Sequence, residues 1–363
     1  MGHTVAPWVA VAVFVAGLAW RASGWFRHGF GAGPGDASAA ARAGAAARGV
    51  AGTLFSARIL AVLRAFAQDV LLQRRIRRLG GARWLAHELM SFAFVALLLV
   101  HALGSVLTAR LFPGYQPTLD PFLALRDVLG AVLLVGVAIA AARRFVVKVP
   151  RRDTRPSDTW AIVVVGVIVV SGVLLEAVKI GSYSTFEAMV REYASEADRA
   201  PLEAWWTREM GTVAPHPTAP ADLAAEGKKL HAQSCAPCHS PPQSAFVGYA
   251  TAAVLRPLSP RLDAIGAPRL LWLLHFYACL VGLALLPFTK MFHLLATTLS
   301  LLVNAVVARG KAAPANAATK QMIELDACTH CCACSAQCSM AMASDAVGNR
   351  AILPSEKISA LRR

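Results

Sequence analysis

The stretch LLWLLHFYACLVGLALLPFTKMFHL, residues Leu270 to Leu294, is almost entirely apolar, yet it contains His275 and His293. A helix of about 20 apolar residues is long enough to cross a bilayer, so this stretch predicts a membrane span. From 275 to 293 a continuous helix makes about five full turns and rises roughly 27 Å. The two imidazoles would therefore share one face at opposite depths of the membrane. Ionisable side chains inside a span are functional candidates.

Composition places the whole chain in the membrane class. Of its 363 residues, 56% are hydrophobic and only 16% are charged, whereas about 25% of residues are charged in soluble domains. The formal net charge of +15 would suit a nucleic-acid binder, but arginine-rich cytoplasmic loops of a membrane protein produce the same sum. We therefore expect no nucleic-acid partner.

Five hydrophobic stretches are long enough to be transmembrane helices. They cover residues 5–24, 84–110, 122–143, 160–180 and 268–307. The first lacks a basic leading segment and a clear cleavage site, so we expect a retained helix rather than a signal peptide. The fifth exceeds the roughly 20 residues that a bilayer requires; we expect it to extend beyond the membrane or to bend at Pro287. The predicted fold is an all-α integral membrane protein.

Basic residues predict the orientation, because loops rich in Lys and Arg stay in the cytoplasm. Segments 73–83 and 143–155 are arginine-rich, whereas the loop 111–121 contains no Lys or Arg. We therefore expect a bacterial cytoplasmic (inner) membrane protein with a periplasmic amino terminus and a cytoplasmic carboxyl terminus. The predicted domains are helix 1 (1–24), a cytoplasmic linker with an amphipathic helix (25–83), helices 2–4 (84–180), a periplasmic insert (181–267), helix 5 (268–307) and a cytoplasmic tail (308–363).

The insert contains Cys235-Ala-Pro-Cys238-His239, the C-x-x-C-H sequence to which haem c is attached. Cys235 and Cys238 would bond the porphyrin, and His239 would be the proximal iron ligand. Haem c is attached outside the cytoplasm, in agreement with the orientation predicted from charge. A zinc site or a disulfide is the alternative.

The distal ligand of this haem is open. No methionine lies between the motif and the fifth span, and the possible ligands upstream are Met189, Met210, His216 and His231. We expect Met210 or His216 to be the axial ligand, with five-coordinate iron as the alternative.

The second predicted span also contains two histidines, His87 and His101. In a continuous helix they are about 40° short of four full turns apart, so they too share a face. Spans two and five run in opposite directions, so His87 would meet His293 near the cytoplasm and His101 would meet His275 near the periplasm. Two haems b, each held by two histidines, are predicted. The alternative is that these imidazoles bond to carbonyl groups or lie at the interface.

The membrane part of the chain resembles a known family of cytochromes. The residues that carry the likeness are 68–87 (QDVLLQRRIRRLGGARWLAH), 143–160 (RRFVVKVPRRDTRPSDTW), 171–181 (SGVLLEAVKIG) and 270–294. They resemble the gamma subunit of respiratory nitrate reductase and, more closely, the cytochrome b subunits of heterodisulfide-reductase-like and sulfite-reductase-linked membrane complexes. The likeness covers about 50–180 and 268–306 and is strongest at LPFTKMFH.

This resemblance implies two haems b with the crossed pairing given above, and a quinone bound near one of them. Lys290 and Glu176 are the candidate quinone contacts. The chain departs from the family in two ways. The two span-two histidines are closer together in the nitrate reductase subunit than His87 and His101 are here, and the family in its usual form lacks a c-type insert between spans four and five.

The tail contains CTHCCACSAQC, residues 328–338. Its cysteines at C-x2-C-x2-C-x3-C spacing, typical of a [4Fe–4S] ligand loop, are Cys328, Cys331, Cys334 and Cys338. Cys332 breaks the pattern and is an alternative to Cys331, and Ser339 stands where proline often follows. The motif resembles the first ferredoxin-like motif of heterodisulfide-reductase-type proteins. A zinc knuckle is the alternative metal site.

Together these features predict four redox centres in order across the membrane: haem c, two haems b and a cluster. We expect a membrane electron-transfer subunit of a hetero-oligomeric, quinone-linked oxidoreductase complex. It would pass electrons between the quinone pool or a periplasmic carrier and a cytoplasmic iron–sulfur or catalytic subunit. No nucleophile–base pair or phosphate loop is visible, so catalysis on a small molecule is expected in a partner. The alternatives are a redox-inactive membrane anchor with a zinc-binding docking tail, and an electron wire without a quinone site.

Overall fold

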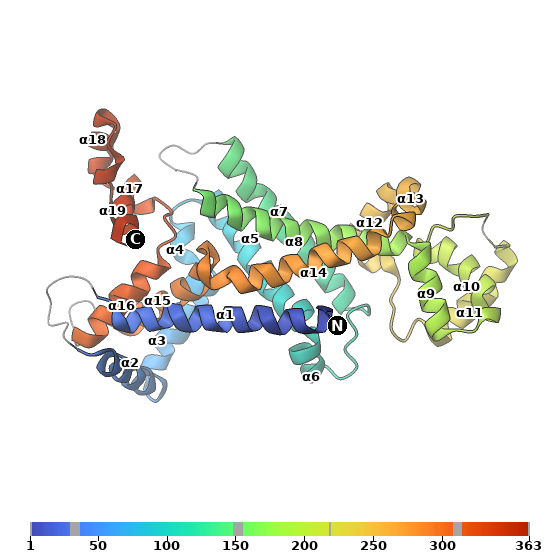
Figure 1. The fold of residues 1–363 in the computed structure, drawn as a ribbon, viewed down its shortest axis with the longest axis horizontal. Coiled ribbons are helices and arrows are strands. Elements are labelled where there is room, and N and C mark those ends of the chain that lie inside the picture. The colour runs from blue at the N-terminus through green and yellow to red at the C-terminus, as the bar shows by residue number, and fades with distance from the viewer. Residues whose placement is uncertain (1, 30–36, 148–154, 218, 308–313, 362–363) are drawn as a thin grey trace. The chain divides into compact units, whose positions relative to one another are not determined.

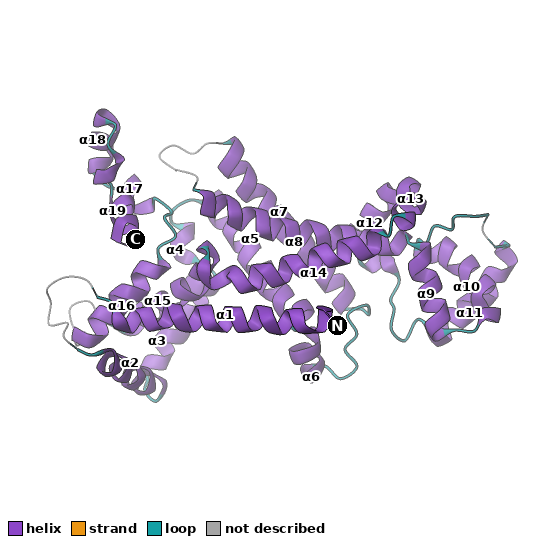
Figure 2. Ribbon diagram, in the orientation of Figure 1, coloured by secondary structure: helices purple, strands orange, loops and turns teal. Residues whose placement is uncertain are grey.

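The computed structural model describes residues 2–29, 37–147, 155–217, 219–307 and 314–361. Within these ranges all regular structure is helical and there is no β-strand (Figure 2). The all-α prediction is therefore confirmed for the described part of the chain. Most of the basic loop 143–155, namely 148–154, and the start of the predicted tail, 308–313, lie outside the described residues.

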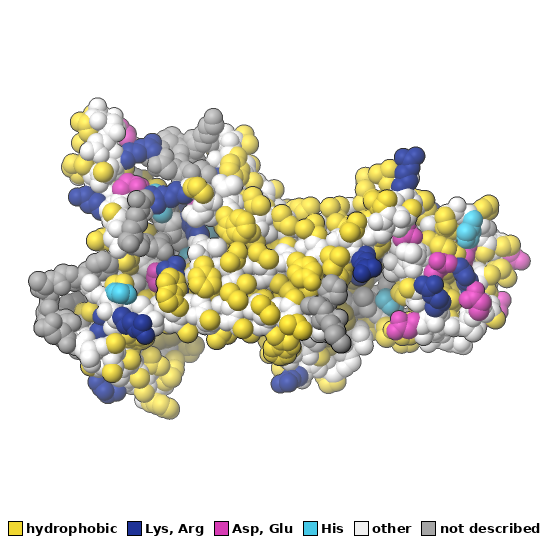
Figure 3. All heavy atoms as spheres, viewed as in Figure 1, with side chains coloured by type: hydrophobic (Ala, Val, Ile, Leu, Met, Phe, Trp, Pro, Cys, Tyr) yellow, Lys and Arg dark blue, Asp and Glu magenta, His cyan; other side chains and the backbone are white. Residues whose placement is uncertain are grey.

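The helices that are long and apolar enough to cross a membrane coincide with the predicted stretches. They are Thr4–Arg27, Gly81–Ala102, Phe122–Val146, Pro156–Gly181 and Ala267–Phe288. Hydrophobic side chains dominate the visible faces of the long helices (Figure 3). The chain is thus a multi-pass membrane protein. In addition, Ala39–Leu54 and Arg58–Leu71 form an apolar pair bent by 93°, as in a broken span or a re-entrant loop; both lie in the segment that was predicted to be a cytoplasmic linker.

The chain divides into two compact units, of which the first consists of Met1–Glu88, Ala140–Val163 and Leu280–Arg363. Its complete elements are α1 (Gly2–Arg27), α2 (Ala39–Leu54), α3 (Arg58–Ala65), η1 (Phe66–Leu71), α4 (Arg74–Arg77), η4 (Ala142–Val146), η10 (Leu286–Phe288), η11 (Lys290–Phe292), α15 (His293–Val306), α16 (Pro314–Ala327), α17 (Ala333–Ala336), α18 (Met340–Val347), η12 (Arg350–Ile352) and α19 (Pro354–Leu361). The unit also includes parts of α5 (Gly81–Leu97), α7 (Phe122–Ala141), α8 (Pro156–Gly181) and α14 (Ala267–Leu285).

The core of the first unit forms where α1, α15 and α16 pack together (Figure 1). Its buried apolar side chains are Trp25, Phe292, Ala296 and Ile323. One carboxylate ties α16 to α1: Asp326 accepts a hydrogen bond of 2.7 Å from the Trp25 indole and pairs at 3.2 Å with Arg21. This core fixes the position at which α15 begins.

The long apolar stretch 268–307 is broken, as the expected bend at Pro287 implied. Helix α14 ends at Leu285, the 3₁₀ turns η10 and η11 follow, and α15 starts at His293. Proline lacks an N–H group and clashes with the preceding turn, so it ends a regular helix. The prediction that His275 and His293 share a face of one continuous helix is therefore wrong.

The second predicted span also departs from a regular helix. Helix α5 ends at Leu97 and continues as the π-helical turns η2 (Leu98–Ala102) and η3 (Gly104–Thr108). Because π turns hydrogen-bond from residue i to i+5, they change the angular position of each later side chain. His101 lies in η2, so its direction does not follow from the 3.6-residue period used above.

The second unit consists of Leu89–Ile139 and Val164–Cys279. Besides parts of α5, α7, α8 and α14, its elements are η2, η3, α6 (Ala109–Leu111), α9 (Tyr183–Tyr193), η5 (Glu196–Asp198), α10 (Arg199–Trp205), η6 (Trp206–Met210), η7 (Ala221–Leu223), α11 (Ala224–Ser234), η8 (Pro242–Ser244), α12 (Phe246–Leu255), η9 (Arg256–Leu258) and α13 (Ser259–Ala264). Acidic and basic side chains gather over α9, α10 and α11 (Figure 3).

Helices α9, α10 and α11 form a small helical group inside the insert (Figure 1). Its buried cluster consists of Tyr183, Phe186, Val190, Leu202, Trp206 and Met210. Helices α10 and α11 approach so closely that a Cβ atom added to Gly227 would lie 1.9 Å from the Pro201 carbonyl oxygen. Only glycine permits this contact between the two helices.

The insert is hydrogen-bonded to the loop 111–121. The Ser240 amide donates to the Thr118 carbonyl at 2.9 Å, and the Thr118 hydroxyl donates to the Cys238 carbonyl at 2.5 Å. The Ser240 hydroxyl also accepts from the Asp120 amide at 2.9 Å. The loop without basic residues and the C-x-x-C-H segment are therefore in direct contact within the second unit.

Candidate functional site

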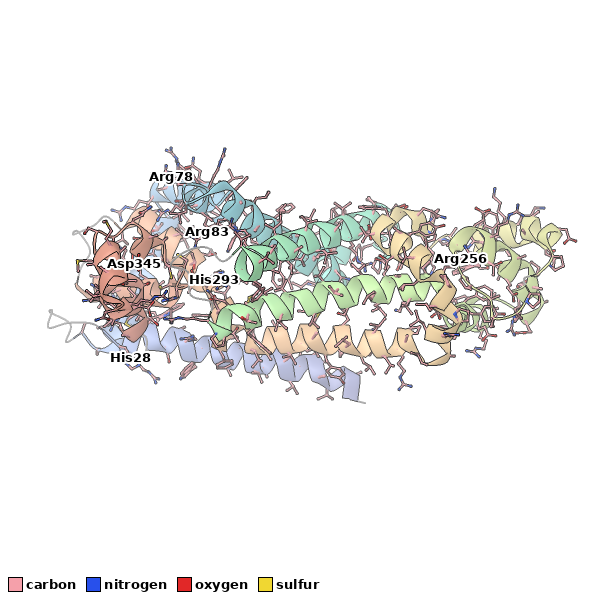
Figure 4. All side chains as sticks on the ribbon, turned by 90° about the horizontal axis from the view of Figure 1, so that it is seen from above. His28, Arg78, Arg83, Arg256, His293 and Asp345 are labelled. Carbon is pink, nitrogen blue, oxygen red and sulfur yellow. The ribbon has the colours of Figure 1, made fainter. Side chains whose placement is uncertain are left out.

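In the first unit, two imidazoles face each other across two separate elements. His87 comes from α5 and His293 begins α15, and their ring centroids are 6.1 Å apart with 61° between the ring planes. Figure 4 shows His293 together with Arg83, which lies in the first turn of α5. The predicted pairing of His87 with His293 is thus present as a contact.

Each of these rings has its Nδ1 atom hydrogen-bonded to an oxygen. His293 Nδ1 lies 2.6 Å from the Lys290 carbonyl, and His87 Nδ1 lies 2.6 Å from the Gln73 side-chain oxygen. Gln73 is buried and has a left-handed backbone conformation (φ 45°). Because these oxygens accept a hydrogen bond from Nδ1–H, the Nε2 atoms keep their lone pairs for a metal. The sequence did not point to Gln73, because it lies 14 residues before His87 and the short helix α4 separates it from α5.

The second unit contains the other predicted pair. His101 and His275 have ring centroids 6.2 Å apart, with 39° between the ring planes. His275 Nδ1 lies 3.0 Å from the Ile168 carbonyl and 3.2 Å from the Ser171 hydroxyl, both on α8. A Cβ atom added to Gly172 would lie 3.1 Å from His275 Cε1. Glycine at this position therefore allows α8 to pack directly on the ring.

These separations can be compared with the geometry of a haem that has two histidine ligands. A metal–imidazole bond is about 2.0–2.1 Å long, so two rings on opposite sides of one iron have centroids roughly 6 Å apart. Both pairs meet this condition, and in each pair the rings come from different elements. Three of the four rings also have the Nδ1 partner that metal-ligating histidines use. The residues therefore fit two haem b sites.

Arg126 on α7 lies close to the second pair, although no pattern in the sequence marks it as a site residue. Its charge acts on both His101 and His275, and its Nη1 donates to the Pro117 carbonyl at 2.5 Å. Its Nε is buried and has no hydrogen-bond partner among the described residues. A guanidinium in this state is suited to a nearby anionic group, such as a haem propionate.

Lys290 and Glu176, the candidate quinone contacts, have different surroundings. The Lys290 ammonium pairs with Asp158, which also pairs with Arg144, so one carboxylate is shared by two cations in the first unit. Glu176 packs against Gly248 in the second unit and interacts with the charges of Arg126, Asp127 and Lys179. Asp127 in turn accepts backbone hydrogen bonds from Val247 and Gly248 at 2.9 and 3.1 Å.

The C-x-x-C-H segment borders a cavity of about 340 Å³ in the second unit. The lining residues are Gln116, Thr118, Phe186, Met189, Val190, Tyr193, Ala194, Leu202, Trp206, Ser234, Cys235, Cys238 and His239. Most of this wall is apolar, as haem c requires. Burial lowers the pKa of His239, so its imidazole is neutral at neutral pH and can be an iron ligand. The donor set and the cavity together fit a haem c.

The predicted distal ligands do not line this cavity. Met210 is buried in the core cluster that also contains Trp206. The His216 ring is half-exposed; its Nε2 is 3.2 Å from the Tyr183 hydroxyl and its Nδ1 is 3.7 Å from Glu203. Both side chains are thus taken up by other contacts.

The cysteine loop in the tail has an unusual backbone and is tied to the first unit. His330 and Cys332 adopt left-handed conformations, with φ values of 51° and 58°. The Arg83 guanidinium donates to the Cys331 carbonyl at 3.2 Å, and His330 Nε2 is 2.6 Å from Glu356 of α19. Cys332 is buried, whereas the four predicted ligands are partly or fully accessible.

The thiols do not converge in the structure. Among the described residues, no three His, Cys, Asp or Glu side chains come together as a metal site. Burial alone would raise the pKa of Cys331, but the Ala333 amide and the Arg83 cation hold it below its ordinary value, which favours the thiolate that binds metals. The cluster stays a prediction from cysteine spacing.

Comparison with known proteins finds two distant relatives, both with names of redox proteins. It is 22% identical over 231 residues (63% of this chain) to an EtfAB:quinone oxidoreductase of Syntrophomonas wolfei subsp. wolfei. It is 29% identical over 126 residues (33% of this chain) to a subunit of the dihydromethanophenazine:CoB--CoM heterodisulfide reductase of Methanosarcina thermophila. These matches span 26% and 48% of the lengths of the two relatives. No family model and no solved structure matches the chain.

Both relatives are named as oxidoreductases or subunits of one, and this chain has five apolar spanning helices. The distant similarity to redox proteins and the apolar helices together support a general role in membrane electron transfer.

Proposed function

We propose that the chain is a membrane electron-transfer subunit that carries two haems b, one haem c and a [4Fe–4S] cluster. It passes electrons between the quinone pool or a periplasmic carrier and a cytoplasmic iron–sulfur or catalytic partner. The observation that carries this proposal is the spacing of 6.1 and 6.2 Å between the rings of the two histidine pairs. When bound, the haems and the cluster supply one-electron chemistry.

The protein's own residues have defined tasks in this function. His87 and His293 hold one haem b, and His101 and His275 hold the other. The carbonyl groups of Lys290 and Ile168 fix the ring orientations through Nδ1. Cys235 and Cys238 attach haem c, and His239 is its proximal ligand. Cys328, Cys331, Cys334 and Cys338 hold the cluster in the tail.

Partners and location follow from the same assignment. In the proposed orientation the insert 181–267 and the amino terminus are periplasmic in a bacterial inner membrane, and the tail 308–363 is cytoplasmic. A periplasmic carrier would meet the insert, and a cytoplasmic subunit would meet the tail. Because the Lys290 ammonium is already held in an ion pair with Asp158, Glu176, which interacts with Arg126, is the better placed of the two candidate quinone contacts.

Cofactor analysis of the purified protein tests the proposal directly. Reduced spectra should show both b-type and c-type haem, and chemical assay should find iron with acid-labile sulfide. A colourless protein that contains zinc instead would support the redox-inactive anchor. Reduction of the haems by a quinol analogue, with and without a quinone-site inhibitor, separates a quinone-linked subunit from a wire without quinone.

Substitution of Cys235 and Cys238 together by serine should abolish covalent haem staining on a denaturing gel. Serine cannot form a thioether, so the double variant has no covalent bond to haem, whereas Cys238→Ser alone would keep at most the bond to Cys235. The matched control is Cys279→Ser, because Cys279 lies on α14 and outside the cavity. Staining that persists in the double variant would contradict the haem c assignment.

Substitution of Cys334 by serine should remove the cluster's electron paramagnetic resonance signal and leave the haem spectra unchanged. Cys334 is the accessible third cysteine of the motif, and serine is a poor replacement for a thiolate ligand. The matched variant is Cys332→Ser, whose buried side chain contacts His330 and should keep the signal. Loss of the signal in Cys332→Ser would identify Cys332 as the ligand in place of Cys331.

A further inference from the structure

The cavity beside Cys235 and Cys238 has a wall that is formed by one face of α9. Phe186, Met189, Val190 and Tyr193 all line it. These residues follow the i, i+3, i+4, i+7 pattern of a single helical face. The lining also includes Cys235 and His239. The cavity thus has the proximal motif on one part of its wall and α9 on another.

Helix α9 is rigidly held in this position. Its N-cap is Ser182, whose hydroxyl accepts from the Thr185 amide at 3.0 Å and donates to Asp263 at 2.6 Å. Phe186 and Val190 are buried in the cluster around Trp206, with exposures of 1% and 5%. Met189 lies between these two residues on the same helical face, so the well-packed backbone of α9 holds its side chain at the cavity.

The lining contains few side chains that can bind iron. Besides the C-x-x-C-H residues, the described lining has one thioether, Met189, and one phenol, Tyr193. The Tyr193 side chain is 63% exposed and hydrogen-bonds to Glu192. The remaining members of the lining are apolar, indole, amide or hydroxyl side chains, which are not usual haem ligands.

The upstream alternatives are directed elsewhere. Met210 and His216 make the other contacts described above. His231 is buried against Trp205 and Trp206, with ring centroids 6.4 and 5.8 Å away, and it does not line the cavity.

We propose that Met189 is the distal ligand of haem c, in place of Met210 or His216. The proposal rests on the proposed function, because it requires haem c at Cys235 and Cys238. Histidine–methionine coordination raises the haem potential relative to coordination by two histidines, so the insert would exchange electrons with a partner of comparatively high potential. The proposed ligand lies on α9, which is separated in the chain from Cys235 by α10 and α11.

The test uses the full-length, haem-loaded protein with three variants. Met189→Leu keeps the apolar volume of the side chain but removes the sulfur. Met189→His supplies a nitrogen ligand at the same position. Met210→Leu is the matched control, because it removes the thioether that lies in the core instead of the cavity.

The readouts are covalent haem staining, the weak red absorption band that a methionine sulfur gives to ferric haem, and the midpoint potential of the c-type signal. In Met189→Leu the band should disappear and the potential should fall while staining persists. Met189→His should lack the band and have a potential below that of the wild type. Met210→Leu should keep both the band and the potential.

The outcomes separate this proposal from the proposed function. A wild-type protein without covalent haem would overturn the proposed function and this assignment with it. A stained Met189→Leu protein that keeps the sulfur band would overturn only the ligand assignment. Loss of the band in Met210→Leu, but not in Met189→Leu, would restore the prediction from sequence. A wild-type c-type haem that lacks the band would also exclude Met189 as ligand.

Discussion

Replacement of His293 by alanine should remove one haem b from the protein and leave the covalently attached haem c in place. His293 faces His87 at a ring separation of 6.1 Å, and alanine has no atom that can bind iron. The ratio of haem b to haem c should fall by about half, since each bis-histidine site loses its haem with either ligand. Pyridine haemochrome spectra of purified protein measure this ratio.

Two controls make the result specific. His28→Ala removes an exposed histidine at the end of the first span and should leave the ratio unchanged. His87→Ala should produce the same loss as His293→Ala, and the double variant should lose no more than either single variant. If both haem b signals persist in His293→Ala, the pairing of His87 with His293 is wrong.

Replacement of Gly227 by alanine should disrupt the insert. The added methyl group would lie 1.9 Å from the Pro201 carbonyl oxygen and 2.6 Å from its carbon, so α11 must move away from α10. Overpacking of a tightly packed site costs about 1–3 kcal/mol and occasionally more; contact with rigid backbone belongs to the severe end of this range. Because α11 leads into Cys235, haem c incorporation should fall as well.

Limited proteolysis and haem staining measure this effect. Gly227→Ala should be cleaved within 181–267 at protease concentrations that leave the wild type intact. Gly49→Ala is the matched control: Gly49 lies within α2 and has no atom within 4 Å of an added Cβ, so alanine should be neutral or slightly stabilising in that helix. Equal protease resistance of Gly227→Ala and wild type would argue against the packing of α10 on α11.

The two histidine pairs illustrate why part of the site was predictable. The pairing was expected from span direction, and the structure brings together the same residues. The argument that the two histidines of each span share one face of a regular helix was wrong. The helix that contains His275 ends before Pro287, and π turns change the angular position of His101. The agreement depends on the antiparallel order of the spans, which is more robust than the angular position of any one side chain.

The remaining site residues could not be predicted, because they are defined by tertiary contacts that no local sequence pattern reveals. Gln73, Arg126 and Asp158 are polar residues in arginine-rich or apolar surroundings, and nothing in their sequence context marks them as neighbours of a histidine or a lysine. Met189 was one of several candidate distal ligands upstream of the C-x-x-C-H motif. It is preferred over Met210 only because it lines the cavity, whereas Met210 lies in the core cluster.

The sequence by itself determined where the five long apolar helices lie, because a backbone in lipid must satisfy its hydrogen bonds within the segment and must be covered by apolar side chains. It also determined the attachment motif at Cys235 and the cysteine spacing in the tail, since these require only neighbouring residues. The tertiary structure alone decided which polar groups hold the histidine rings and which side chains face the cavity. Those contacts join residues far apart in the chain, and packing and backbone breaks set them.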